Sequence, residues 1–241
     1  MSIGDKHIRF ACSNRLTLWR AQTLLTKEPD TIRWIDGFNA GDVLYDIGAN
    51  VGTYSIYAGI RGVRVFAFEP EAQNFALLNR NIYLNKLQET VSGYNLALGS
   101  SHRIGDLYLS GDIAGGALNN FGEATDFNHK PFVARFKQGV LCLTLDELVD
   151  RYNLPAPTHV KIDVDGLERE IVDGAKGLLR NPQLKSVLIE LNSKLPAHTA
   201  LIGILAEIGF RVENKQSTTT EANSPFGDQH NYIFARSHDQ H

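Results

Sequence analysis

The chain has 241 residues, of which 43% are hydrophobic and 21% charged, a composition typical of a folded globular protein that excludes a disordered or collagen-like one. This length allows one sizeable core, because domains of this size bury about 70% of the surface of the unfolded chain. The net charge of −3 lacks the excess of Lys and Arg that binding to nucleic acid or to an anionic membrane requires.

Neither end of the sequence suggests secretion or membrane insertion. The first residues lack the apolar run of a signal peptide, and the longest apolar stretch, residues 200–210, is too short to cross a bilayer. The two cysteines, Cys12 and Cys142, are too few for a disulfide framework or a Cys-rich metal site. We therefore expect a cytoplasmic protein in which both cysteines are small buried residues.

The first 40 residues predict a mainly helical N-terminal extension with one short strand. From residue 41 to residue 98 strands and helices alternate, a pattern typical of parallel strands joined by helices. The predicted strands are residues 7–12, 43–45, 63–68 and 91–98, and the predicted helices are residues 16–26, 28–38, 53–60 and 71–87.

Residues 100–139 are rich in Gly, Asn and Asp, with one candidate hairpin strand at residues 106–110. Loops of this length inside a domain are commonly functional or mobile. Further predicted strands are residues 140–143, 159–162, 187–190, 210–213 and 232–236, with helices at 145–152, 167–179 and 198–208. The sequence therefore predicts one α/β domain over residues 41–236, followed by a flexible tail at 237–241.

A glycine-rich turn follows the strand at residues 43–45. Gly48 and Gly52 permit a tight bend and a close approach by a ligand, while Asp46 and Glu69 lie at the ends of consecutive strands. Ligands of open α/β sheets bind at this edge, where an acid accepts hydrogen bonds from both ribose hydroxyls. The predicted cofactor-binding residues are Asp46, Gly48, Ala49, Asn50, Gly52, Glu69, Pro70 and Asn95. Asn95 would meet an adenine edge, although an ordinary turn asparagine explains it equally well.

Electrostatics separates two ligand classes for this site. A dinucleotide would place its pyrophosphate beside Asp46, and Asn50 stands where the G-x-G-x-x-G pattern requires its middle glycine. S-adenosylmethionine has no phosphate and carries sulfonium and ammonium charges that an acid attracts. We therefore predict S-adenosylmethionine, with Glu69 on its ribose, and keep an NAD(P)-dependent oxidoreductase as the alternative.

The sequence resembles the FkbM family of S-adenosylmethionine-dependent methyltransferases. The resemblance lies in YDIGANVGTYS (45–55), VFAFEPEAQNFALLNRNIYLN (65–85), NLALGS (95–100), TLDEL (144–148), KIDVDGLERE (161–170), IELN (189–192) and IFAR (233–236). It implies the class I methyltransferase fold, a Rossmann-like, seven-stranded and mostly parallel sheet with helices on both faces. It also implies methylation of an oxygen on a sugar or natural product. The family more often has Glu at the position of Asp165.

The strand at residues 159–162 brings Asp163 to the same edge of the sheet as Asp46 and Glu69. We predict that Asp163 contacts the methionine ammonium or orients the acceptor, with Glu190 as a second catalytic residue. Asp163, Glu190 and Asn192 together offer the oxygen ligands of an Mg²⁺ site, although such oxygens also occur as hydrogen-bonded strand ends.

Two other groups of residues have simpler explanations. Asp165 and Glu168 have the D-x-x-E spacing of a helix N-cap and its partner, which we favour over a direct role for Asp165. His129, His198 and His230 are candidate bases beside the variable loops, but each is more typical of a solvated residue.

The resulting hypothesis is a methyltransferase that uses S-adenosylmethionine to methylate a hydroxyl of a small-molecule or saccharide acceptor. Residues 110–139 and 215–227 would close over that acceptor and exclude water. An RNA methyltransferase would need a basic face, so we expect no nucleic-acid partner. A module that binds the cofactor without turnover is the third alternative.

Overall fold

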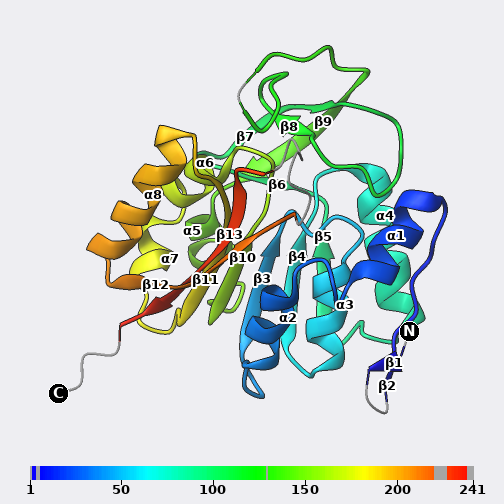
Figure 1. Ribbon diagram of the computed structural model, residues 1–241, viewed down its shortest axis with the longest axis horizontal. Helices are drawn as coiled ribbons and strands as arrows, with labels where there is room; N and C mark the ends of the chain where they lie inside the picture. The colour runs from blue at the N-terminus through cyan, green and yellow to red at the C-terminus, as the bar shows by residue number, and fades with distance from the viewer. Residues whose placement is uncertain (1, 4–5, 129, 220–226, 238–241) are drawn as a thin grey trace.

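The computed structural model describes residues 2–3, 6–128, 130–219 and 227–237. Its centre is a seven-stranded sheet with the order β12-β13-β11-β10-β3-β4-β5 (Figure 1). These strands are β3 (Val43–Ile47), β4 (Arg64–Phe68), β5 (Val91–Tyr94), β10 (His159–Ile162), β11 (Ser186–Asn192), β12 (Phe210–Ser217) and β13 (Gln229–Arg236). The five strands from β11 to β5 are parallel, and β13 runs antiparallel to both of its neighbours. The predicted mostly parallel, seven-stranded sheet is confirmed.

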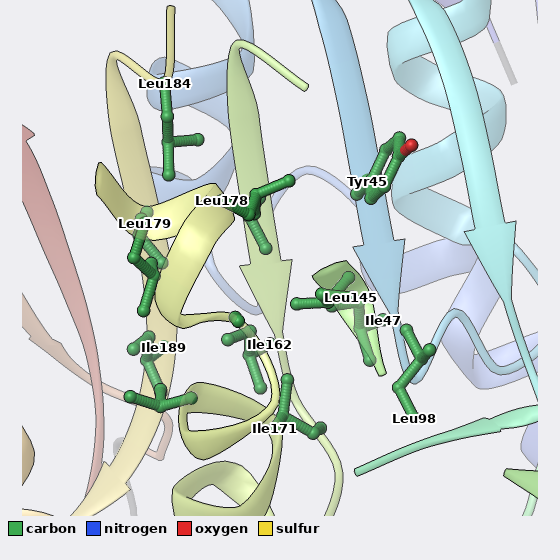
Figure 2. Packing of buried hydrophobic residues seen from close by; sticks show 14 of the residues in the cluster. Tyr45, Ile47, Leu98, Leu145, Ile162, Ile171, Leu178, Leu179, Leu184 and Ile189 are labelled. Carbon is green, nitrogen blue, oxygen red and sulfur yellow. The ribbon is translucent and has the colours of Figure 1, made fainter. Parts of the chain in front are cut away.

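Helices cover both faces of this sheet (Figure 1). Alternate strand residues enter two separate cores, because Tyr45 and Ile47 point to one face and Leu44 to the other. The helices are α1 (Arg15–Thr23), α2 (Pro29–Asp36), α3 (Thr53–Ile60) and α4 (Ala72–Leu84), then α5 (Leu145–Asp150), α6 (Glu168–Asp173), α7 (Lys176–Arg180) and α8 (Pro196–Glu207). Figure 2 shows the core on the side of α5–α8, where Leu145, Ile171 and Leu178 pack against Tyr45 and Ile162.

Residues 97–143 build a second sheet, with the order β6-β9-β7-β8. Its strands are β6 (Ala97–Leu98), β7 (Arg103–Leu109), β8 (Asn120–Phe121) and β9 (Phe136–Leu143). The prediction of a long loop with one hairpin strand is therefore wrong in extent. A separate apolar cluster that includes Leu107, Phe121 and Val140 stabilises this sheet. Cys142 is buried within it as expected, whereas Cys12 is exposed.

Two predicted elements are interrupted. The strand predicted at residues 91–98 leaves the main sheet after Tyr94 and joins β9 as β6. The helix predicted at residues 167–179 divides into α6 and α7 at Gly174, where the two backbones come so close that a Cβ would overlap the carbonyl oxygen of Gly99. Glycine is needed at this contact, and the helix ends there.

The strand predicted at residues 7–12 is also wrong. Only β1 (Ser2–Ile3) and β2 (Lys6–His7) form a short antiparallel pair. Beyond them the backbone N–H groups of Arg9 and Ala11 donate to asparagine side chains, Asn85 and Asn81, at the end of α4. None of the helices in the described part of the chain combines the length and apolar character needed to span a bilayer.

Candidate active site

Three neighbouring strands of the main sheet, β4, β3 and β10, end side by side, and β11 next to them continues to Asn192. The register pairs Phe68 of β4 with Ile47 of β3, Ile47 with Ile162 of β10, and Ile162 with Ile189 of β11. The residues that follow these four are, in the same order across the sheet, Glu69, Gly48, Asp163 and Glu190. Parallel strands thus bring together side chains that are far apart in the sequence.

A cavity of about 700 Å³ opens over this edge, within the roughly 300–1,000 Å³ typical of ligand sites. The strand ends form its floor, and its walls come from α1, residues 116–119 and the second sheet. Of the predicted site residues, those that line it are Gly48, Asn50, Glu69, Pro70, Asp163 and Glu190. Ala49 lines a smaller cavity of about 40 Å³, which shares Gly48, Asn50 and Asp163 with the large one.

The turn after β3 requires its first glycine. Gly48 has φ +77°, and a Cβ there would overlap the carbonyl oxygen of Asp163. Gly52 has φ +82° and packs against Leu78. Between them Asn50, also in the left-handed region, donates its backbone N–H to Glu69 Oε2 at 2.8 Å. The turn therefore connects the ends of β3 and β4 directly.

Glu69 is held by backbone donors. Its Oε1 accepts from the N–H of Glu71 at 2.9 Å and its Oε2 from that of Asn50, and burial raises its pKa to about 7. Asn95 supports this strand end, because its amide donates to the carbonyls of Glu69 and Pro70, both at 2.9 Å. Asn95 does not line the cavity, so an adenine contact by its side chain stays a prediction.

Asp46 lies beneath the cavity floor, with 1% of its surface exposed. Its Oδ2 accepts from Ser55 Oγ at 2.5 Å, and its Oδ1 lies 3.9 Å from Lys161 Nζ. Lys161 in turn donates to Asp163 Oδ2 at 2.8 Å. Asp46 lines neither of the two cavities and is connected to Asp163 through Lys161, so a direct cofactor contact by Asp46 stays a prediction.

Lys161 was not predicted as a site residue, although the sequence carries a signal for it. A lysine in the middle of the buried strand β10 must find anionic partners, because an unpaired buried charge is costly. Burial opposes its charge, yet Asp163 and Asp46 raise the pKa of Lys161 above its usual value. The lysine is therefore a fixed cation between two acids.

The pKa values of Asp163 and Glu190 are shifted in opposite directions although the two residues lie on neighbouring strand segments. Burial acts to raise the pKa of Asp163, but the charges of Lys161 and Lys27 hold it below its ordinary value. Burial and the negative charge of Asp163 raise the pKa of Glu190 well above its ordinary value. Of these two carboxyl groups, Asp163 is thus the one that loses its proton more readily and Glu190 the one that holds it more tightly, which suits opposite roles in proton transfer.

Residues 115–118 are fastened over the cavity by hydrogen bonds. The Gly115 carbonyl accepts from Arg20 Nε at 2.7 Å, and the Gly116 carbonyl accepts from Asn50 Nδ2 at 2.7 Å. The N–H of Leu118 donates to Asp165 Oδ2 at 2.6 Å. The N-cap role predicted for Asp165 is wrong, since α6 has Leu167 at its N-cap and Asp165 holds this segment instead.

The structure does not support the Mg²⁺ hypothesis. Asn192 is used elsewhere, because its Nδ2 donates to Asn128 Oδ1 at 2.9 Å and its Oδ1 accepts from the N–H of Lys194 at 3.0 Å. Within the described ranges, no group of three or more His, Cys, Asp or Glu side chains is arranged to hold a metal ion.

Neither His198 nor His230, two of the three histidines predicted as candidate bases, lines the cavity. His198 is buried, so the solvated position expected for it is wrong; its Nε2 lies 3.2 Å from Glu168 Oε2. His230 Nδ1 lies 3.0 Å from the carbonyl of Asp228. His129 lies outside the described residues, as do residues 220–226 of the predicted loop at 215–227. Thr218 and Thr219 of that loop line the cavity.

Comparison with known proteins shows similarity to methyltransferases over most of the chain. The model of the methyltransferase FkbM domain matches residues 46–212. A hexuronic acid methyltransferase of Haloferax volcanii is 30% identical over 77% of this chain and 70% of its own length. The 31-O-demethyl-FK506 methyltransferase of Streptomyces tacrolimicus is 24% identical over 73% and 75%. Short matches to two tRNA (guanine(37)-N(1))-methyltransferases cover only 20% and 12% of those proteins.

Solved structures agree on the fold. A precorrin-6Y C5,15-methyltransferase from Geobacter metallireducens superposes with a TM-score of 0.50 and 19% identity, over 95% of each chain. This likeness supports the α/β methyltransferase fold and says nothing of the substrate. The domain match and the relative from Haloferax volcanii show that the chain belongs to the FkbM methyltransferase family and is an S-adenosylmethionine-dependent methyltransferase.

Proposed function

We propose that this protein transfers a methyl group from S-adenosylmethionine to a hydroxyl oxygen of a saccharide. The main support is the row formed by Glu69, Gly48, Asp163 and Glu190 along one cavity. The relative from Haloferax volcanii, whose name states that it acts on a hexuronic acid, supports the choice of a saccharide. A cytoplasmic location is part of the same proposal.

The residues present fit the cofactor. Gly48 lines the cavity without a side chain, and the buried Glu69 carboxyl, which also lines it, lies where ribose hydroxyls would donate. Asp163 supplies negative charge beside them for the cationic methionine end. When bound, S-adenosylmethionine supplies an electrophilic methyl on a sulfonium, which leaves as a neutral thioether.

Two side chains, those of Asp163 and Glu190, would form hydrogen bonds with the acceptor. Asp163 Oδ2 is engaged by Lys161, so Oδ1 is left to accept from the acceptor hydroxyl and to take its proton as the new carbon–oxygen bond forms. Glu190, whose pKa is raised by burial and by the charge of Asp163, would donate in its protonated form to a neighbouring oxygen of the same sugar. Alignment of the hydroxyl with the methyl accounts for most of the rate enhancement in such a displacement.

The other hypotheses have less support. The family assignment removes the NAD(P)-dependent oxidoreductase. A tRNA substrate has support only from the short matches, and the chain has 24 basic against 27 acidic residues, without the positive excess that binding to RNA uses.

The test is methyl transfer by the purified full chain with isotope-labelled S-adenosylmethionine. Hexuronic acid glycosides, neutral glycosides and tRNA would be offered separately. Label in the glycosides is the expected result. Label in tRNA alone would overturn the saccharide assignment. Donor binding without transfer to any acceptor would favour a module that binds the cofactor without turnover.

Glu69→Gln should weaken S-adenosylhomocysteine binding by about 1–3 kcal/mol, because hydrogen bonds to a charged carboxylate are lost. The wild-type affinity should also fall as the pH is lowered through about 7, since the raised pKa of Glu69 means that its carboxylate is protonated there. Calorimetry across pH 6–8 measures both effects, and the variant should lose the pH dependence. Glu89→Gln, at an exposed position, is the matched control. Unchanged affinity in Glu69→Gln would exclude the ribose contact.

A further inference from the structure

One face of the N-terminal helix forms a wall of the cavity. The residues on this wall recur every three or four positions and therefore share one side of the helix. They are Leu16, Trp19, Arg20 and Thr23 of α1, followed by Thr26 and Lys27. This wall lies outside the stretch that matches the family model, residues 46–212, so the family alone assigns it no role.

The charges of this wall are opposite to those of the cavity floor. Among the described residues that line the cavity, Arg20 and Lys27 are the only Lys or Arg side chains. The other charged side chains there are acids: Glu69, Glu71, Asp163, Asp165 and Glu190. A ligand that spans the floor and the wall therefore lies against acidic side chains at one end and against basic side chains at the other.

The guanidinium of Arg20 can bind an anion. Its Nε donates to the Gly115 carbonyl, and in the described part of the chain no carboxylate lies within ion-pair distance of its guanidinium. The two terminal nitrogens form the planar fork that binds a carboxylate with two parallel hydrogen bonds. Lys27 differs, because its Nζ lies 2.6 Å from Glu28 Oε1 and its charge is already paired.

Trp19 adds an apolar surface beside this cation. Trp19 lines both the large and the small cavity, yet 43% of its surface is exposed. A large exposed indole at the mouth of a polar site offers a flat face to a partly apolar ligand. The C–H face of a pyranose ring has this character, while its hydroxyls remain available to polar groups.

We propose that Trp19 and Arg20 form the acceptor subsite for a saccharide that carries a carboxylate, with the sugar ring on the indole and its carboxylate on the guanidinium. This deepens, and rests on, the proposed methyl transfer to a saccharide. The carboxylate anchors the sugar, and the anchoring selects which hydroxyl reaches Asp163. The methionine end of the donor carries the same chemical group, so the test separates the two sources.

Arg20→Gln should be compared with wild type on a uronic acid glycoside and on the matching neutral glycoside. The ratio of KM for the acidic sugar to KM for the neutral sugar should rise about 10- to 100-fold, because loss of the Nε contact with the Gly115 carbonyl acts on both sugars alike. The S-adenosylhomocysteine Kd, measured by calorimetry, should stay within about twofold. Arg20→Lys, which keeps the charge without the fork, should recover part of the loss. Arg15→Gln, on an exposed position of the same helix, is the control.

Three outcomes overturn the subsite. An equal weakening of S-adenosylhomocysteine binding would assign the guanidinium to the donor's carboxylate. An equal rise in KM for both sugars would show a general effect on the wall. A product methyl group released by mild alkali would be an ester, which makes the carboxylate the acceptor and not the anchor. A wild-type protein that methylates both sugars equally refutes only this subsite, whereas one that methylates neither refutes the proposed function as well.

Discussion

Asp163→Asn is expected to lower kcat by about 10²–10⁴-fold, because an amide cannot take the proton of the acceptor hydroxyl. The variant should still fold, since Lys161 keeps Asp46 as an anionic neighbour. Initial rates at saturating donor and acceptor measure the effect, and thermal unfolding checks the fold. Asp150→Asn, exposed at the end of α5, is the matched control.

The change in pH profile separates a chemical role of Asp163 from a structural one. Loss of the proton acceptor should leave a residual rate that rises with pH, because the hydroxyl must then lose its proton to solvent. An Asp163→Asn enzyme with the wild-type rate would reject the proposed role. A low rate with an unchanged pH profile would indicate that Asp163 only positions other groups.

Gly48→Ala is expected to destabilise the protein by about 3–5 kcal/mol and to abolish cofactor binding. The added Cβ meets the backbone of Asp163 while φ stays in the left-handed region, so two costs add. Gly62→Ala is an informative control, because Gly62 has φ +92° with no atom within 4 Å of the added Cβ. That control should lose only about 1–2 kcal/mol.

Thermal unfolding of the two alanine variants gives the comparison, at about 2–4 °C per kcal/mol for a domain of this size. Both variants lose stability through the left-handed backbone conformation, so the difference between their unfolding temperatures measures the cost of the contact between the added Cβ and the Asp163 backbone. Equal losses in both variants would mean that the turn relaxes away from Asp163, and the close contact would then carry no energetic weight.

The sequence predicted the part of the site that depends on parallel strands. The residue after a short parallel strand must lie at the shared edge, so Glu69 and Asp163 were identifiable without coordinates, as was Glu190 at the end of the predicted strand at residues 187–190. Gly48 was identifiable because a turn at that edge needs a left-handed residue. The alternation of strands and helices predicted the parallel pairing, whereas the seven strands and both helical layers were implied by the resemblance to the FkbM family.

The remaining parts depend on contacts between distant segments, which no local pattern reveals. Asp165 has the spacing of a helix cap, but the N–H of Leu118, 47 residues away, occupies its carboxylate. In the sequence, nothing marks Trp19 and Arg20 as site residues. Their role depends on the position of α1 over the strand ends, which only the structure shows. The strands within residues 100–139 pair mainly with one another in a small separate sheet. This pairing joins segments that no strong alternation of apolar and polar residues marks in the sequence.

The fastening of residues 115–118 has a consequence for how related enzymes diverge. Arg20 and Asn50 hold this segment through the carbonyls of Gly115 and Gly116, and Asp165 holds it through the N–H of Leu118. Both carbonyls belong to residues with no room for a Cβ, which would lie 2.8 Å from Thr17 at Gly115 and 2.8 Å from the carbonyl oxygen of Ile113 at Gly116. Related enzymes that keep these two glycines can therefore exchange neighbouring side chains that line the cavity, such as that of Ala117, and with them the preferred acceptor, while the anchoring hydrogen bonds persist.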